Sequence, residues 1–440
     1  MNKIKVIGAG LAGCEAAWQI ARAGVPVELF EMKTLRKSPA HHRDTFAELV
    51  CSNSLKASRL DSAAGLLKEE MRRFSSLCLA SADRCSVAAG GALAVDRTEF
   101  SEFITERIRS HPNITVREEV VEELSPQEIT VVATGPLTDE KLAESIARLC
   151  RCENLSFYDA AAPIVTRESV DMNIAFCASR YGKGGDDYIN CPMNREEYEA
   201  FYRELISAET APLKDFDRPL TVYEGCMPVE VLAKRGEDSI RFGPLKPVGL
   251  IDPRTGHRPW AAVQLRRENR AGSLFNLVGF QTNLKFPEQK RVFSMIPGLG
   301  DAQFVRYGVM HRNTFICSPK LLQKDLSLKA YPNLFFAGQL SGVEGYMESA
   351  ASGIVAGRNA LSRALKSAPL ILPPETMIGS LLGYITDESV TNFQPMGANF
   401  GILPPLSEPI RDKRQRYGEF SRRSLEYYDQ HISENRENQE

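Results

Sequence analysis

The sequence lacks the long apolar runs and the charge imbalance that would assign it to several common protein classes. No stretch approaches the roughly 18 consecutive apolar residues that a transmembrane helix needs. Lys and Arg total 54 against 56 Asp and Glu, so the net charge of −2 provides no global attraction to nucleic acid. A nucleic-acid partner would therefore require a local basic surface.

Metal-binding and secretion patterns are also missing. None of the 10 cysteines forms a CxxC pair, and the 6 histidines show no HExxH spacing. Cys150 and Cys152 are too close for an easy disulfide and lack a second ligand pair, so we interpret them as structural. The N-terminus enters a predicted strand at once and has no signal-peptide pattern. We therefore expect a cytoplasmic protein with free thiols, no metal and no membrane segment.

A nucleotide-binding motif opens the chain. Residues 4–7 predict a short strand, 12–21 carry small apolar residues at helical spacing, and a second strand, 27–30, ends at Glu31. Between the first strand and the helix lies a GxGxxG turn made of Gly8, Ala9, Gly10, Leu11, Ala12 and Gly13. Its glycines let the backbone approach a pyrophosphate at the helix N-terminus, and Glu31 is placed to bind the adenosine ribose.

Two later segments indicate which dinucleotide binds. The predicted strand 128–134 ends at Thr134 and Gly135, and the strand 334–337 ends at Gly338 and Gln339, followed by a helix of small residues. Large flavoproteins bind FAD with such a late strand, turn and helix, which a simple NAD dehydrogenase does not need. We expect these four residues to line the FAD cleft, although Thr134 could equally be an ordinary strand end. Flavoproteins generally have Asp where this chain has Gln339.

The 440 residues exceed the usual size of one hydrophobic core. We predict an α/β fold: a Rossmann-like FAD-binding domain of the large flavoprotein type with an inserted α/β domain. Residues 1–154 form the first part of the FAD-binding domain, 155–320 the inserted substrate domain, and 321–440 the return strand and helix with a C-terminal helical segment. A charged helix is expected from about Arg411 to His431.

Two cysteines stand in turn-like surroundings and are candidate reactive thiols. Cys226 lies between Gly225 and Met227-Pro228, where glycine and proline favour a shaped loop. Cys51 precedes a Ser-Asn-Ser stretch and is followed by Lys56 and Arg59, which could favour a thiolate. The residues alone indicate an FAD-dependent enzyme with candidate reactive cysteines.

Several longer segments of the chain have distinctive sequences, among them GAGLAGCEAAWQIA, FAELVCSNSLKA, YEGCMPVEVLAKRG, LKPVGLIDPRTGHRPWAAVQLRREN and AGQLSGVEGYMESAASG. These segments resemble the folate- and FAD-dependent tRNA methyltransferase family, which makes 5-methyluridine at uridine-54 in the T-loop of tRNA. The resemblance runs from residue 1 to about residue 405. The Gly338-Gln339 pair is likewise similar to the tRNA-modifying branch of the flavoproteins.

The resemblance implies a reaction and roles for particular residues. The donor would be 5,10-methylenetetrahydrofolate, with reduced FAD as carrier and NADH or NADPH as reductant. Cys226 would add to uracil C6 and Cys51 would assist at C5, although the order of the two thiols stays open. His311 would stack on the folate pterin; without the resemblance it would be interpreted as a core histidine.

The tRNA would be held by local basic clusters. The candidate residues are Arg266, Arg267, Lys290, Arg291, Arg411 and Arg414. Runs of charge more often form solvated faces, so this assignment depends on the resemblance. Phosphate contacts at these residues would make tRNA affinity depend on salt.

Three alternatives stay open. A related flavoprotein modifies the tRNA wobble uridine together with a GTPase, but it has a longer chain with an added helical domain. A non-catalytic flavoprotein could bind tRNA as a folding aid. A plain FAD-dependent reductase would oxidise NADPH without any need for RNA.

Overall fold

Short apolar strands from both ends of the chain build one sheet. A computed structural model describes residues 3–38, 40–151, 155–160, 162–182, 185–211, 227–269, 271–308, 310–390 and 393–431, without the side chains of 155–160 and 310–314. In these residues the first sheet has the order β16-β17-β7-β1-β2-β6, and only β16 with β17 is antiparallel. The bounds are β1 Ile4–Ile7, β2 Val27–Glu31, β6 Ile114–Glu118, β7 Thr130–Val132, β16 Ser327–Leu328 and β17 Tyr331–Phe336.

The late strand joins the sheet that the first strand begins. β17 pairs with β7, and β7 pairs with β1, all in parallel. The predicted Rossmann-like fold, completed by a strand late in the chain, is therefore confirmed. β17 begins at Tyr331, three residues before the start that the sequence predicted.

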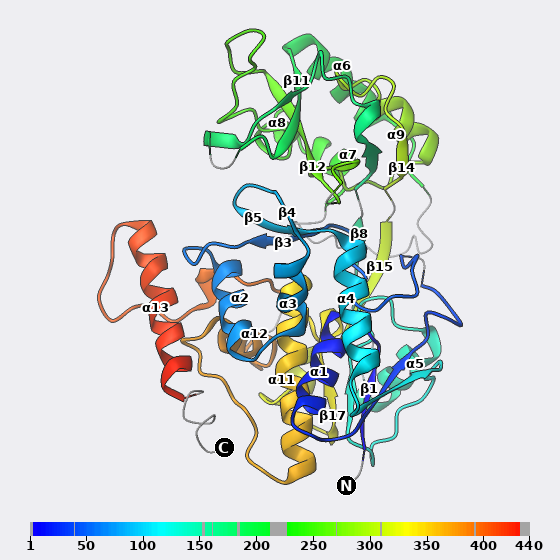
Figure 1. Cartoon of the computed structure of the whole chain (residues 1–440), viewed down its shortest axis with the longest axis vertical. Helices are drawn as coiled ribbons and strands as arrows, with labels where there is room; N and C mark the ends of the chain where they lie inside the picture. The colour runs from blue at the N-terminus through cyan, green and yellow to red at the C-terminus, as the bar shows by residue number, and fades with distance from the viewer. Residues whose placement is uncertain are drawn as a thin grey trace.

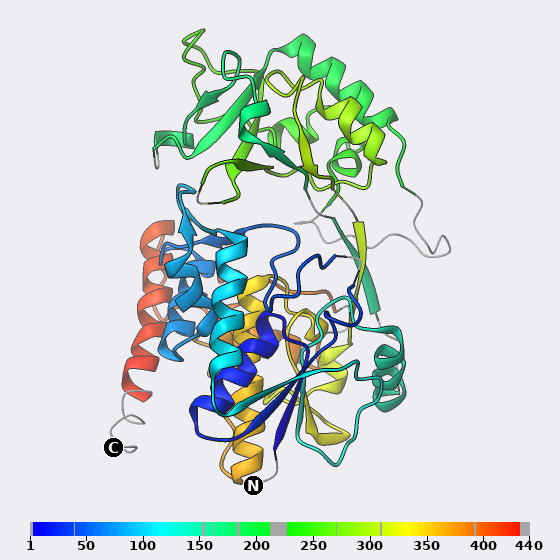
Figure 2. The same ribbon diagram turned by 45° about the vertical axis from the view of Figure 1, so that its right-hand side comes forward.

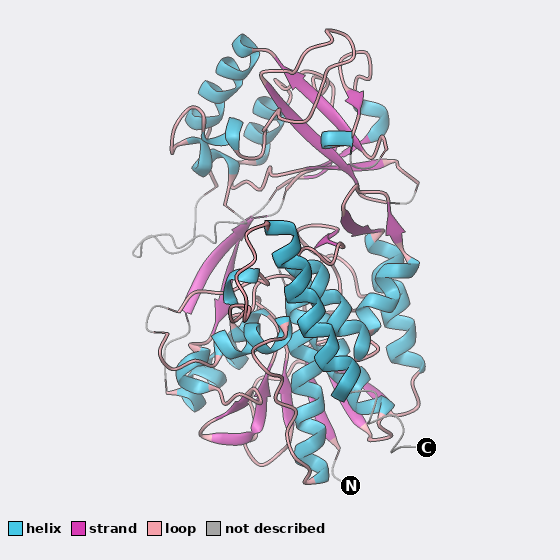
Figure 3. Cartoon of the chain, turned by 90° about the vertical axis from the view of Figure 1, so that its left-hand side faces the viewer, coloured by secondary structure: helices cyan, strands magenta, loops and turns pink. Residues whose placement is uncertain are grey.

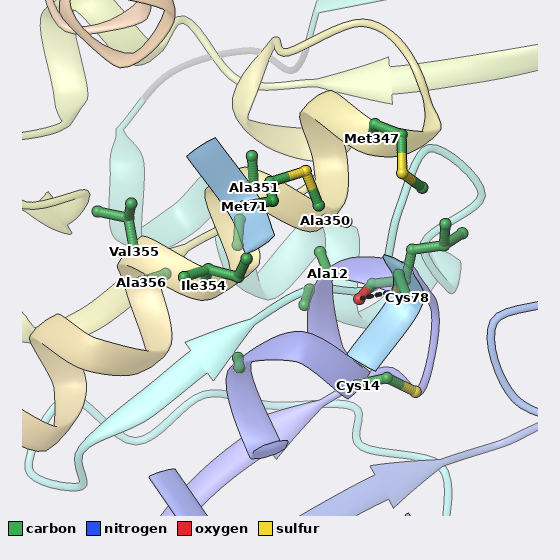
Figure 4. Packing of buried hydrophobic residues seen from close by; sticks show 14 of the residues in the cluster. Ala12, Cys14, Met71, Cys78, Met347, Ala350, Ala351, Ile354, Val355 and Ala356 are labelled. Atoms are coloured by element: carbon green, nitrogen blue, oxygen red, sulfur yellow. Dashed lines mark hydrogen bonds between the residues drawn. The ribbon is translucent and has the colours of Figure 1, made fainter. Parts of the chain in front are cut away.

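Two helices from opposite ends of the chain pack on each other beside this sheet. α1 (Leu11–Arg22) follows β1, and α11 (Tyr346–Leu365) follows β17. A Cβ built at Gly353 would lie 2.1 Å from the carbonyl oxygen of Ala12, and one at Gly357 would lie 2.6 Å from the Cα of Ala16. Figure 4 shows side chains of both helices, among them Ala12, Ala350 and Ala351, in the core around this contact. The contact therefore requires glycine at both positions of α11.

Further helices surround the sheet. They are α2 (Ala63–Arg73), α3 (Leu77–Arg84), α4 (Arg97–Ser110), α5 (Glu140–Cys150), α10 (Ser318–Leu321), α12 (Met377–Ile385) and α13 (Lys413–His431). Figure 1 shows α2 and α13 at the left of this lower domain and α5 at its right. The buried carboxylate of Glu70 in α2 accepts hydrogen bonds from Ser424 and Tyr428 of α13. The predicted C-terminal helix is thus fastened to the FAD-binding domain.

A second domain has an antiparallel sheet and a core of its own. Its strand order is β10-β11-β12-β13-β9-β14. The bounds are β9 Ile164–Thr166, β10 Phe176–Cys177, β11 Tyr188–Met193, β12 Ala261–Arg267, β13 Leu274–Leu277 and β14 Phe304–Arg306, with helices α6 Arg195–Ser207, α7 Val229–Ala233, α8 Ser239–Phe242 and α9 Phe286–Phe293. Figure 3 shows these strands and helices as a separate upper lobe. The boundaries at residues 154 and 320 stay a prediction.

Two small sheets lie where the lobes meet. β8 (Leu155–Ala160) pairs with β15 (Met310–Phe315), and Figure 2 shows this pair extending from the lower domain towards the upper lobe. β3 (Ser54–Ala57), β5 (Ala92–Val95) and β4 (Ser86–Val87) form a three-stranded sheet at the top of the lower domain. None of the helices in the described part of the chain has both the length and the apolar character of a membrane-spanning segment.

We expect Gly353→Ala to destabilise the protein by about 3 kcal/mol, because the added methyl group meets backbone that cannot move independently. Gly383→Ala is the matched control, since a Cβ at that helical glycine of α12 meets nothing within 4 Å. The control should be neutral or stabilising by up to about 1 kcal/mol. Urea unfolding of both variants measures the difference, and equal unfolding free energies would contradict the packing argument.

Candidate functional site

The glycine turn lies at the carboxyl end of β1 and begins α1. Gly8 has a φ of 96°, and its N–H donates to the carbonyl of Phe30 in β2 at 2.8 Å. A Cβ at Gly13 would lie 1.8 Å from the carbonyl oxygen of Gly8, so the helix can start this close to the strand only with glycine there. A Cβ at Gly10 meets nothing within 4 Å, which leaves the α1 N-terminus accessible. Anions bind favourably at such a helix end.

Glu31 at the end of β2 holds the turn in shape. One carboxylate oxygen accepts the N–H of Ala9 at 2.8 Å, and the other accepts those of Met32 and Lys33 at 2.8 and 3.0 Å. A carboxylate has about four lone-pair positions, so about one is left for a ribose hydroxyl. Glu31 therefore shapes the turn through these backbone contacts. It also lies at the position where the sequence predicted a contact with the ribose.

The second helix N-terminus faces the same space. Gly338, with a φ of 75°, follows β17, and its N–H donates to Ser352 of α11 at 2.7 Å. Gln339 donates to the carboxylate of Glu344 at 2.8 Å. Thr134 and Gly135 follow β7, and the Thr134 hydroxyl bonds that of Thr138 at 2.7 Å. The ends of β1, β7 and β17 thus converge.

These segments enclose a cavity of about 420 Å³. Of the predicted cofactor residues, those that line it are Gly8, Gly10, Leu11, Ala12, Glu31, Thr134, Gly135, Gly338 and Gln339. The other two predicted residues shape the turn itself: the Ala9 N–H donates to Glu31, and Gly13 lies against the Gly8 carbonyl. The accessible face at Gly10, the two helix N-termini and the acid at the end of β2 fit a dinucleotide such as FAD.

Cys51 also lines this cavity, on the loop before β3. Its N–H donates to the hydroxyl oxygen of Tyr346 at 2.8 Å, and its Sγ lies 2.9 Å from the same oxygen. Burial raises the pKa of Tyr346 well above the usual value of a phenol, so this hydroxyl keeps its proton. Because the oxygen accepts the Cys51 N–H, its proton is available to the sulfur. Tyr346 was not among the predicted site residues. The sequence feature that could have indicated it is an aromatic residue directly after Gly345, at the first position of α11.

The cations that the sequence placed beside Cys51 are paired elsewhere. Lys56 bonds the carboxylate of Glu348 at 2.6 Å, and Arg59 pairs with Asp61 at 3.1 Å. Three other arginines approach the Cys51 loop instead: Arg97, Arg266 and Arg306. The sequence could not show this, because the three lie on α4, β12 and β14.

The structure describes neither the second predicted thiol, Cys226, nor the side chain of the predicted folate residue, His311. Cys226 lies outside the described residues, which resume at Met227. The backbone N–H of Val229 donates to the carbonyl of Gln281 at 2.7 Å, and Gln281 lines the cavity. His311 lies on β15 opposite Asp159 of β8, and its side chain is outside the description. Their roles stay predictions.

The predicted tRNA residues do not form one surface. Arg266 is 8% exposed and bonded to Ser52 and Asn53, so its assignment to a phosphate is corrected: it is a buried structural cation. Its neighbour Arg267 is only partly exposed. Lys290 and Arg291 lie on α9 of the upper lobe, whereas Arg414 lies on α13 of the lower domain (Figure 1).

The exposed arginines differ in how far they are already neutralised. Arg291 pairs with Glu204 and with Glu288, and these carboxylates raise its pKa. Arg414 is 89% exposed and lies 3.5 Å from Asp61, and Arg411 beside it is exposed as well. No group of His, Cys, Asp and Glu that could hold a metal ion occurs among the residues that the structure describes.

The parallel sheet, the glycine turn, the acid after β2 and the returning α11 define an FAD-binding flavoprotein. The sequence profile of a family described as Glucose inhibited division protein A matches residues 3–368. The chain belongs to this family.

Its relatives narrow the assignment within the family. Proteins named methylenetetrahydrofolate–tRNA-(uracil-5-)-methyltransferase TrmFO match it from Acetivibrio thermocellus, with 59% identity over 98% of this chain and 99% of the relative, and from Desulfitobacterium hafniense, with 59% over 97% of each. The relative of that name from Heliobacterium modesticaldum is 57% identical over 98% of each chain.

Solved structures support the fold. Aquifex aeolicus GidA in its form I crystal matches 99% of this chain and 78% of its own, with a TM-score of 0.68 and 18% identity. The form II crystal gives a TM-score of 0.67 at 17% identity, over 99% and 76% of the two chains. At this identity the likeness concerns the fold alone.

We expect Glu31→Ala to lower FAD affinity at least tenfold, because three backbone N–H groups of the turn lose their charged acceptor. Glu28→Ala, on the same strand, is the matched control, since Glu28 pairs with Lys3 and Arg117 instead. Fluorescence titration of apoprotein with FAD measures both. Equal affinities of the two variants would contradict the role given to Glu31.

Proposed function

We propose that this protein methylates C5 of uridine-54 in the T-loop of tRNA, with 5,10-methylenetetrahydrofolate as the one-carbon donor. The relatives with 55–59% identity are named for folate-dependent tRNA uracil-5 methylation. The observation that carries the proposal is that Cys51 lines the same cavity as the glycine turn and the α11 N-terminus. A thiol is thereby held beside the site that fits FAD.

The chain's own residues supply nucleophilic and proton-transfer chemistry. Uracil C5 is a weak nucleophile until a thiolate adds at C6, and this role is assigned to Cys226. The proton that leaves C5 after the new carbon–carbon bond has formed goes to Cys51. FAD, when bound, would carry the one-carbon unit in its reduced form, with NADH or NADPH as the source of electrons.

Substrate positioning is assigned to two further parts of the chain. His311 on β15 would stack on the pterin of the folate. The T-arm would be held by exposed basic residues, among which Arg411 and Arg414 are less neutralised than Arg291. A tRNA substrate would be met in the cytoplasm, which is the location we propose.

The FAD-loaded protein, incubated with a tRNA transcript, methylenetetrahydrofolate and NADPH, should form 5-methyluridine at position 54, detected by mass spectrometry of nuclease fragments. Cys226→Ala and Cys51→Ala should each lower the yield at least a hundredfold. Cys177→Ala is the matched control and should keep full activity, because Cys177 is exposed on β10.

Other outcomes of this assay identify other functions. Modification at the wobble position would indicate the related anticodon enzyme. NADPH oxidation without RNA would indicate a reductase, and FAD and tRNA binding without product would indicate a binding protein. Full activity of Cys226→Ala would contradict the assignment of the nucleophile.

The affinity for tRNA should depend on salt if basic side chains contact its phosphates. Each lost phosphate contact should reduce the slope of log affinity against log salt by about 0.7 to 0.9. We expect the double variant Arg411→Gln, Arg414→Gln to reduce the slope more than Lys290→Gln, Arg291→Gln, because Arg291 is already neutralised. Filter binding at several salt concentrations measures this, and an unchanged slope in both would remove these residues from the interface.

A further inference from the structure

Three arginines donate hydrogen bonds to the loop that carries Cys51. Arg97 donates to the carbonyl of Leu49 at 2.8 Å and to that of Val50 at 3.3 Å. Arg306 also donates to the carbonyl of Val50. The residues immediately before the thiol are therefore bound by two guanidinium groups.

The other side of the thiol is held in the same way. Arg266 donates to the Ser52 hydroxyl at 2.7 Å and to the Asn53 side-chain oxygen at 3.0 Å. Asn53, fully buried, in turn donates to the carbonyls of Val95 at 3.0 Å and Arg267 at 2.9 Å. The loop is thus anchored on both flanks of Cys51, by residues of both domains.

The anchors belong to separate parts of the chain. Arg97 begins α4 of the FAD-binding domain, whereas Arg266 lies on β12 and Arg306 on β14 of the upper lobe. The position of the thiol over the cavity therefore depends on how the upper lobe sits on the lower domain.

The arginine cluster carries more positive charge than its buried acid balances. Glu268 pairs with Arg97, and its side chain is 4% exposed. Burial lowers the pKa of both Arg266 and Arg306, and Arg97 lowers that of each further. Among the residues that the structure describes, Glu268 is the carboxylate whose charge acts on Arg97, Arg266 and Arg306 together. Three guanidinium groups facing this one carboxylate form a buried excess of cations, which is costly without a further anion.

The charged and titratable groups packed round Cys51 come from several elements. They are Arg97 of α4, Tyr346 of α11, Arg266 of β12 with Tyr188 of β11 beside it, Glu268 after β12, and Arg306 of β14. Cys51 lies close enough to Arg266, Arg306 and Tyr346 for its charge to act on the pKa of each. A thiolate at Cys51 would place a further negative charge beside these arginines.

We propose that Arg266 and Arg306 are positioning residues that aim Cys51 into the cavity from the upper lobe and hold its sulfur as the thiolate. The inference rests on the proposed function, in which Cys51 accepts a proton from uracil C5. A thiolate held in place needs no separate base to prepare it for that step.

The test uses the FAD-loaded protein and follows alkylation by iodoacetamide between pH 5.5 and 9.5. Tryptic peptide 44–56 contains Cys51 as its one cysteine, and peptide 168–180 contains Cys177, so mass spectrometry reads both thiols in one sample. In the unmodified protein the Cys51 reaction should reach half its maximum about 1 to 3 pH units below the ordinary thiol value of about 8.5. Burial raises the pKa of Cys177, which should react half-maximally above that value.

The variants test the arginines directly. Arg306→Gln and Arg266→Gln should shift the Cys51 midpoint upward, so that its alkylation at pH 7 falls about tenfold for each unit by which the shifted midpoint exceeds 7. Arg306→Lys, which keeps the charge, should recover most of this reactivity. Arg195→Gln is the control, since Arg195 lies in the same lobe, is exposed and pairs with Glu199. The Cys177 midpoint should stay unchanged throughout.

Either of two results would overturn the inference. One is a Cys51 midpoint at or above about 8.5 in the unmodified protein. This measurement does not depend on whether any variant folds. The other is an unchanged midpoint in Arg306→Gln and Arg266→Gln variants that retain FAD and melt cooperatively. Because alkylation requires neither tRNA nor folate, a low, arginine-dependent midpoint without methylation would refute only the proposed function. Methylation with an ordinary midpoint would refute only this inference.

Discussion

The contact between α1 and α11 is the constraint on which the rest of the structure depends. These helices come from opposite ends of the chain, and Gly353 and Gly357 let their backbones approach closely. Because each helix follows a strand of the same parallel sheet, their packing brings both N-termini to one edge of that sheet. The cavity, the glycine turn and the hydroxyl of Tyr346 all lie at this edge.

The second constraint is the loop that carries Cys51, because it joins the two domains. Its backbone carbonyls and polar side chains accept hydrogen bonds from α4 below and from β12 and β14 above. A buried ion pair or cation cluster rarely adds much stability, since desolvation offsets the attraction between the charges. A cluster of this kind can still select one geometry, and here that geometry places a thiol over the FAD-binding cavity.

Much of the cofactor site could be predicted because its signals are local. The GxGxxG turn, Glu31 after the second strand and the small-residue helix after Gly338 each reflect backbone needs of neighbouring residues. The arginines could not be assigned in this way. Arg266 stands in a basic run that resembles a solvated face, and only the pairing of β12 in the sheet shows that its side chain is buried against Ser52 and Asn53.

The amino-acid sequence by itself determined the class of fold, the order of its elements and the choice of FAD, because these follow from short-range patterns of glycine, acid and apolar spacing. It also placed Cys51 in a turn, which the Ser-Asn-Ser stretch after it indicates. Tertiary structure alone decided which charges surround that thiol. Lys56 and Arg59, near in sequence, bond carboxylates, while Arg266 and Arg306, far away in sequence, reach the loop because the upper lobe folds back onto the sheet edge.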